Sequence, residues 1–107
     1  MPFDAGLVAR VDDTLRTLGE KSVRQKNVFG GRGFMLGKSA FVIVWGAGLI
    51  VKTRAAEYLR LLGEHGASPF APDGERAMST WILVEADAVA DDPELADWVR
   101  RGLAAVR

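Results

Sequence analysis

The chain has 107 residues, one histidine, no cysteine and a formal net charge of zero. This composition excludes a disulfide framework, a zinc–thiolate site, a cysteine nucleophile and a histidine-rich metal site. With 49% hydrophobic residues, the chain is expected to form one folded domain, residues 1–107. No apolar run approaches about 18 residues and the N-terminus has no signal-peptide pattern, so we expect a soluble cytoplasmic protein.

The first half of the chain is expected to begin with an amphipathic helix. Asp4 can cap it, Gly19 can end it, and its apolar residues recur at helical spacing: Leu7, Val11, Leu15 and Leu18. Residues 23–29 are expected to be extended, although their interior is polar.

Residues 29–53 are rich in glycine and predict a β-meander. Strands are expected at residues 33–36, 40–45 and 49–53, with turns at Gly37-Lys38 and Gly46-Ala47-Gly48. Both faces of the middle strand are apolar, with Phe41, Ile43 and Trp45 expected on one face and Ala40, Val42 and Val44 on the other.

Three glycines lie between two phenylalanines that are both expected to reach the core, Phe29 and Phe34. We therefore expect a positive φ at one or more of the three: Gly30, Gly31 and Gly33.

The second half predicts a helix, a loop, a strand and a final helix. Thr53 can cap the first of these helices, with Ala55, Leu59 and Leu62 on one face, and residues 67–76 have loop chemistry. Residues 78–85 form a strand with Trp81 and Leu83 on one face and Thr80, Ile82 and Val84 on the other. The last helix begins at Asp91 or Asp92, before Pro93. The order α-β-β-β-β-α-β-α, with its first strand uncertain, predicts an α+β domain: an antiparallel sheet with three helices.

Enzymatic and nucleotide sites find little support in the residues. Gly37-Lys38-Ser39 ends like a phosphate-binding loop, but Arg32 stands where the motif needs its first glycine, and a strand follows where a helix is required. His65 is expected to be exposed at a helix C-terminus. The three tryptophans, Trp45, Trp81 and Trp98, are expected to pack in the core. We expect a non-enzymatic protein with no catalytic residue, metal, nucleotide or other cofactor.

The charges are unevenly distributed along the chain. Residues 1–60 carry ten Lys/Arg and five Asp/Glu, whereas residues 61–107 carry four and nine. Two solvated faces are the simplest interpretation. The basic residues of the first half could instead touch an acidic partner: Arg10, Arg16, Lys21, Arg24, Lys26 and Arg32. They are too sparse to predict direct nucleic-acid binding.

Several segments together resemble the N-terminal domain of TfoX/Sxy-type competence regulators of bacteria, over about residues 5–105. They are Phe29-Gly30-Gly31-x-Gly33-Phe34, Gly37-Lys38-x-Ala40-Phe41, Leu49-Ile50-Val51-Lys52, Pro69-Phe70, Met78-Ser79 and the last helix with Trp98. Arg32, Ala47-Gly48 and Glu85-Ala86-Asp87 depart from the family's usual residues, as in a divergent member. The resemblance implies this fold and a regulatory role. The full-length regulators add a C-terminal helical domain and act with a cyclic-AMP receptor protein in competence-gene transcription.

Two functional hypotheses follow from the sequence. The first is a regulatory protein-interaction domain, with a candidate surface of Arg24, Lys26, Arg32, Phe41, Ile43 and Trp45. Because the strand at residues 40–45 needs cover on both faces, another protein or a second copy in a homodimer could supply it. The alternative is a small-ligand-binding domain with a pocket near Trp45 and Trp81.

Overall fold

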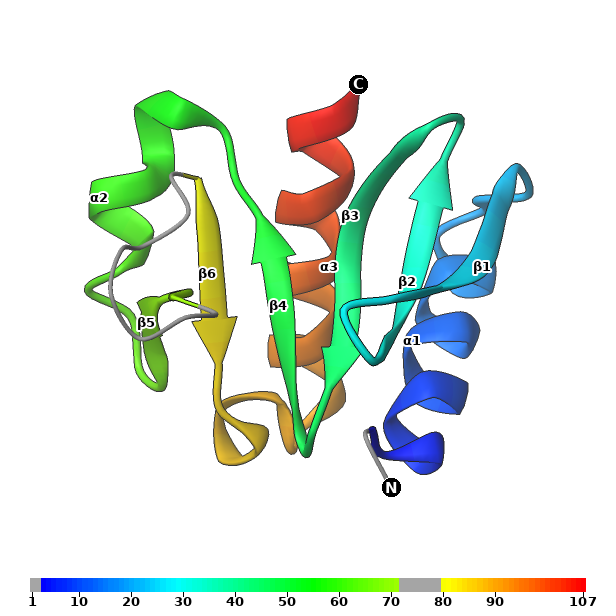
Figure 1. Ribbon diagram of the computed structural model, residues 1–107, viewed down its shortest axis with the longest axis horizontal. Coiled ribbons are helices and arrows are strands. Elements are labelled where there is room, and N and C mark those ends of the chain that lie inside the picture. The colour runs from blue at the N-terminus through cyan, green and yellow to red at the C-terminus, as the bar shows by residue number, and fades with distance from the viewer. Residues whose placement is uncertain (1–2, 72–79) are drawn as a thin grey trace.

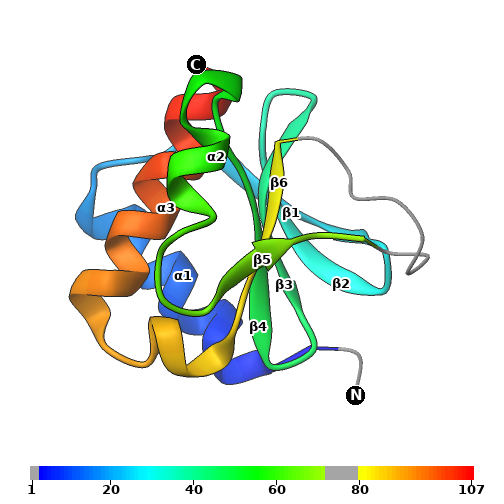
Figure 2. The ribbon, with the colours of Figure 1, turned by 90° about the vertical axis from the view of Figure 1, so that its left-hand side faces the viewer.

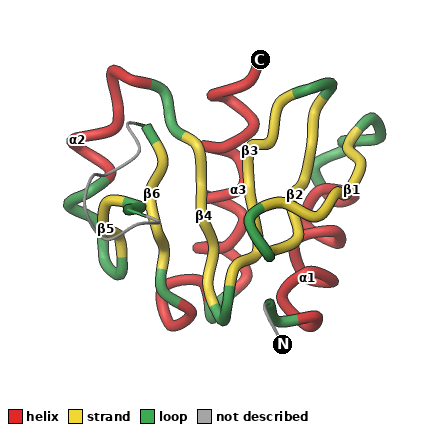
Figure 3. Tube along the Cα trace, in the orientation of Figure 1, coloured by secondary structure: helices red, strands yellow, loops and turns green. Residues whose placement is uncertain are grey.

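The computed structural model describes residues 3–71 and 80–107, which form one antiparallel sheet with its helices gathered on one side (Figures 1 and 2). The strand order is β1-β2-β3-β4-β6-β5. The elements are, in chain order, α1 (Ala5–Thr17), β1 (Val23–Val28), β2 (Gly31–Leu36), β3 (Ser39–Trp45), β4 (Gly48–Lys52), α2 (Tyr58–Leu61), β5 (Ala67–Pro69), β6 (Trp81–Val84) and α3 (Asp92–Val106). The predicted α+β class, an antiparallel sheet with three helices, is confirmed (Figure 3).

The first helix begins and ends where the sequence predicts. The Asp4 carboxylate accepts hydrogen bonds from the backbone N–H groups of Gly6, at 2.8 Å, and Leu7, at 3.3 Å. These bonds satisfy two of the amides that an α-helix leaves unpaired at its start. Gly19 follows the end of the helix with φ +80°, a left-handed conformation in which glycine is favoured.

The main core lies between the sheet and the helices α1 and α3. Leu7, Val11 and Leu15 of α1 are buried there, and α3 packs on β3 and β4. The buried residues of α3 are Leu95, Trp98, Val99, Gly102 and Leu103. Among the described residues, no helix is long and apolar enough to cross a bilayer.

The strand β3 does not alternate as predicted, because it contains a β-bulge. Phe34 pairs with Val42 and the next residue, Met35, pairs with Ala40, so Phe41 is an extra residue in the ladder. Phe41 and Val42 therefore both pack in the core on the helical side, whereas Ile43 points to the other face. The prediction that Phe41 shares a face with Ile43 is wrong, since an inserted residue shifts the two-residue period.

The segment after β4 differs from the prediction in three places. Thr53 does not cap a helix, because its hydroxyl donates to the Thr80 carbonyl oxygen at 3.1 Å. A 3₁₀ turn, Ala55–Glu57, leads into the short helix α2, in which Leu61 is buried and Leu59 is 81% exposed. The change from 3₁₀ to α geometry rotates the expected apolar face. Residues 67–69, predicted as loop, form the edge strand β5. Residues 72–79, which include Met78-Ser79 and part of the predicted loop and strand, lie outside the described residues.

The second face of the sheet has a small core of its own. Ile43 and Ile50 are fully buried there and pack with Phe70, which is 2% exposed. Partly buried side chains surround them: Val28, Ala40, Trp81 and Leu83. The hairpin of β1 and β2 lies on this side, opposite the helices (Figure 2). Other residues of the same chain therefore cover much of the second face of β3, and none of those named here belongs to a helix.

Candidate functional site

The turn between β1 and β2 has an unusual residue at its corner. Val28 pairs with Gly31, so the loop consists of Phe29 and Gly30 alone, with φ of +54° and +78°. Two positive φ angles are typical of a type I′ turn, whose first position is normally Asn, Asp or Gly. A positive φ at a bulky aromatic residue is strained. The prediction of a positive φ in this glycine cluster is confirmed at Gly30.

Gly31 and Gly33 serve a different purpose, which is close approach. A Cβ atom at Gly31 would lie 2.4 Å from the backbone oxygen of Val44, and one at Gly33 would lie 2.8 Å from a methyl group of Val28. Neither distance is possible for real atoms without a shift. The missing side chains therefore let the hairpin fold tightly onto the second face of the sheet.

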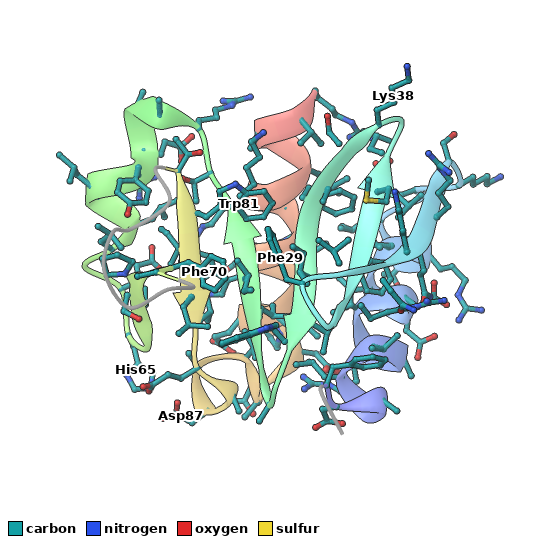
Figure 4. The ribbon with its side chains drawn as sticks, in the orientation of Figure 1. Phe29, Lys38, His65, Phe70, Trp81 and Asp87 are labelled. Carbon is teal, nitrogen blue, oxygen red and sulfur yellow. The ribbon has the colours of Figure 1, made fainter. Side chains whose placement is uncertain are left out.

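Three aromatic residues meet where this hairpin reaches the sheet, and we call Phe29, Trp45 and Phe70 the aromatic rim. The ring centroids of Phe29 and Phe70 are 6.2 Å apart, and those of Trp45 and Phe70 are 5.6 Å apart in an edge-to-face arrangement. The Trp45 indole N–H donates to the Phe29 carbonyl oxygen at 3.3 Å. Figure 4 shows the side chains of Phe29 and Phe70 in front of the central strands. The contacts hold the turn residue in place despite its strained backbone.

The rim is only partly covered. Phe29 is 56% exposed and Trp45 is 36% exposed, whereas Phe70 is buried beneath them. The expectation that Phe29 reaches the core is wrong, because a residue at the corner of a turn is not directed into either face by the pleat. A signal was present in the sequence: Phe-Gly stands where a tight hairpin prefers Asn-Gly.

The predicted interaction surface is only partly assembled by the fold. Arg24 and Lys26 are exposed on β1 and share a face with Val28, which packs in the second core. Arg32 lies on the other face of the hairpin. Phe41 and Ile43 are fully buried and so cannot contact a partner in this fold. Trp45 is accessible as part of the aromatic rim, whereas Phe70 was absent from the predicted set.

The phosphate-loop resemblance ends at the turn between β2 and β3. Lys38 is exposed at the tip of that turn, far from the aromatic rim (Figure 4), and Gly37 before it has φ +63°. Ser39 begins the strand β3 rather than a helix. The turn thus lacks the helix N-terminus on which a phosphate-binding loop depends.

His65 contacts an acidic residue instead of a helix C-terminus. Its Nε2 atom is 3.2 Å from a carboxylate oxygen of Asp87, and both side chains are well exposed, at 76% and 67% (Figure 4). This open setting differs from the sheltered one in which a general base is tuned and oriented.

Three surface hollows of the described residues lie away from the predicted ligand pocket. The three hollows, with volumes of about 310, 360 and 300 Å³, are lined mainly by residues of α1, α3 and the segments beside them. None of the three includes Trp45 or Trp81. The ring of Trp81 instead contacts Lys52, whose ammonium nitrogen is 5.9 Å from the ring centroid.

The fold and its glycine-shaped first hairpin define a small α+β domain that presents an aromatic rim opposite its helices. The TfoX N-terminal domain family matches residues 5–106, nearly the whole chain, and the chain belongs to that family. The resemblance found in the sequence is thereby confirmed. No curated protein and no solved structure shows a match to the chain.

Proposed function

We propose that this domain is a non-enzymatic regulatory module that binds another protein through the aromatic rim. Membership of the TfoX N-terminal domain family supports a regulatory role, and transcriptional control of competence in the cytoplasm is the setting that the family suggests. The single observation that carries the docking surface is Phe29, which is both strained and exposed.

The energetics of Phe29 favour a role in binding. Its positive φ costs on the order of 1–3 kcal/mol. The residue is 56% exposed, so partial burial of its side chain offsets only part of that cost. Asparagine would suit the turn better. An aromatic residue that weakens its own turn and remains accessible fits a contact with a partner, since aromatic anchors dominate binding free energies.

The substitution Phe29→Asn separates docking from folding. It relieves the strained turn and removes a half-exposed ring, so the two effects offset and the melting temperature should change by only a few degrees, roughly 1 kcal/mol of unfolding free energy. Leu59→Asn is a matched control, because Leu59 is 81% exposed on α2, away from the aromatic rim.

The experiment is affinity capture from the native cytoplasm with the wild type and both variants as bait, read by quantitative mass spectrometry. We expect a protein that is enriched by the wild type and by Leu59→Asn but is lost with Phe29→Asn. Equal enrichment by all three baits would place the docking surface elsewhere. A large loss of stability in Phe29→Asn would show that the ring is needed for folding.

A further inference from the structure

The strand β1 is the open edge of the sheet. Among the described residues it pairs only with β2, and its four central residues are exposed. The opposite edge, β5, has three residues and ends at Pro69, which are two devices that protect an edge from pairing. Of the two edges, β1 is therefore the one with room for another strand.

The tight turn determines which backbone groups of β1 face outward. A two-residue loop places a hydrogen-bonded pair at Val28 and Gly31, and such pairs recur at every second residue of an antiparallel ladder. Val23, Gln25 and Asn27 then direct their N–H and C=O groups away from β2. These groups are the ones that an added strand would pair with.

The chain segment that contains this edge carries only positive charges. Residues 21–56 contain seven Lys/Arg and no Asp/Glu. Within the described part of the chain, no ion pair includes Arg24, Lys26 or Arg32. Arg24 and Arg32 donate hydrogen bonds to uncharged groups. Arg24 donates to the carbonyl oxygen of Gly37, and Arg32 donates to the side-chain oxygens of Gln25 and Asn27, each at 2.9 Å. A partner that supplies carboxylates would complete this edge.

A second copy of the chain does not meet this requirement. Two β1 strands that pair antiparallel about a two-fold axis, with their faces matched, would place Arg24 or Lys26 opposite or diagonal to the same residues of the other copy. Like charges directly opposite each other are destabilising in a sheet. The edge thus disfavours self-association and favours an acidic strand.

We infer that β1 accepts an extended acidic segment of another protein as an added strand, with carboxylates beside Arg24 and Lys26 and an apolar side chain against Phe29. The strand leads directly into the Phe29 turn, so a segment paired along β1 ends beside the exposed ring. This inference rests on the proposed function, because it names the chemistry of the same partner.

A protein segment fits this surface better than a nucleic acid. Single-stranded nucleic acids stack their bases on open aromatic faces. In the aromatic rim, however, the rings of Phe29 and Trp45 both pack against the ring of Phe70, with interplanar angles of 59° and 75°. The rings therefore pack against one another instead of lying side by side as a platform.

The test begins with a phage-displayed library of random short peptides selected against the immobilised full chain. We expect the enriched peptides to carry acidic residues at alternate positions and an apolar residue at one end. Binding of one synthetic, fluorescein-labelled winner is then followed by anisotropy. Lys26→Glu should weaken it about tenfold or more, roughly 1.4 kcal/mol. The control Arg60→Glu makes the same charge change at an exposed residue of α2, on the helical side of the sheet, and should leave binding within about twofold.

A backbone variant tests strand addition itself. Gln25→Pro removes one outward N–H group without breaking the ladder to β2, and should also weaken binding about tenfold. Lys26→Glu keeps the test decisive if this proline prevents folding. Three results would overturn the inference. They are a selection that enriches no peptide, a selection that enriches peptides without acidic residues, and equal peptide binding by Lys26→Glu and the wild type. Tighter binding of a labelled oligothymidylate that Lys26→Glu abolishes would also overturn it. Peptide binding lost with Phe29→Asn but kept with Lys26→Glu would overturn the strand addition and leave the proposed function standing.

Discussion

Replacing Gly31 by alanine tests whether close approach, rather than backbone freedom, explains the glycine motif. The added Cβ would lie 2.4 Å from the Val44 carbonyl oxygen, about 1 Å short of the 3.4 Å at which ordinary contact begins. It would also lie 3.0 Å from a methyl group of Ile43. Because the nearest atom belongs to the backbone, no side-chain rotation can relieve the clash, and the hairpin must move away from β3.

The magnitude follows from two contributions. Overpacking of this kind costs about 1–3 kcal/mol. Movement of the hairpin also opens part of the cover over Ile43 and Ile50, which are now fully buried and would each lose a fraction of the roughly 1.5–3 kcal/mol that full burial provides. We therefore expect Gly31→Ala to lower the free energy of unfolding by about 2–4 kcal/mol.

Urea denaturation followed by tryptophan fluorescence measures this change, because Trp45 lies beside Gly31. Gly63→Ala is a suitable control, since its nearest neighbour, the Arg60 carbonyl oxygen, is at an ordinary 3.4 Å. It should stay within about 0.5 kcal/mol of the wild type. A similarly small change for Gly31→Ala would refute the account of the hairpin given above.

Three further predictions concern single residues. Gly30→Val should cost about 1–3 kcal/mol of unfolding free energy. Backbone strain at φ +78° is the source of this cost, since no atom lies within 4 Å of the added Cβ. An unchanged melting temperature would contradict this. Arg101→Ala should cost about 1–2 kcal/mol, since the Arg101 side chain is only 23% exposed and its guanidinium makes two hydrogen bonds of 2.9 Å to Glu64. Arg101→Lys should recover part of the loss in the same urea assay, and equal stability of Arg101→Ala and the wild type would count against the prediction. The hydrogen bond from Arg107 lowers the pKa of Glu20, so the stability it adds is present above the ordinary carboxylate pKa and is lost as pH falls through the lowered value. Glu20→Gln should remove this part of the acid dependence of stability, and identical pH profiles for the two proteins would show that the pair contributes nothing.

Local signals in the sequence predicted most of the secondary structure. The Asp4 cap, the Gly19 stop and the glycine turns act through bonds and angles within a few residues, so they can be read without knowledge of the fold. The same holds for the alternation that placed Trp81 and Leu83 on one face of β6, which the structure confirms. Residues 67–69 were missed as a strand because a three-residue edge containing proline has no pattern of its own and forms only by pairing with β6.

The candidate site was predictable in part. The motif that begins at Phe29 marks the segment that forms the proposed aromatic rim, and Arg24 and Lys26 are exposed as a contact surface requires. The sequence places Phe41 and Ile43 in that surface, because a strand with two apolar faces needs cover on both. The structure buries both of them, since the glycine hairpin and Phe70 supply cover that no local pattern reveals.

By itself, the sequence determined the α+β class, the family, the two ends of α1 and the positions of the tight turns, because each depends on residues that are neighbours in the chain. Only the tertiary structure decided the inward direction of Phe41, the exposure of Phe29 and the position of the hairpin over the second face. These features depend on contacts between strands, such as the bulge opposite Phe34 and the approach of Gly31 to Val44. A single extra residue in a ladder reverses which side chains face the core, and its position is set by the partner strand rather than by the strand's own residues.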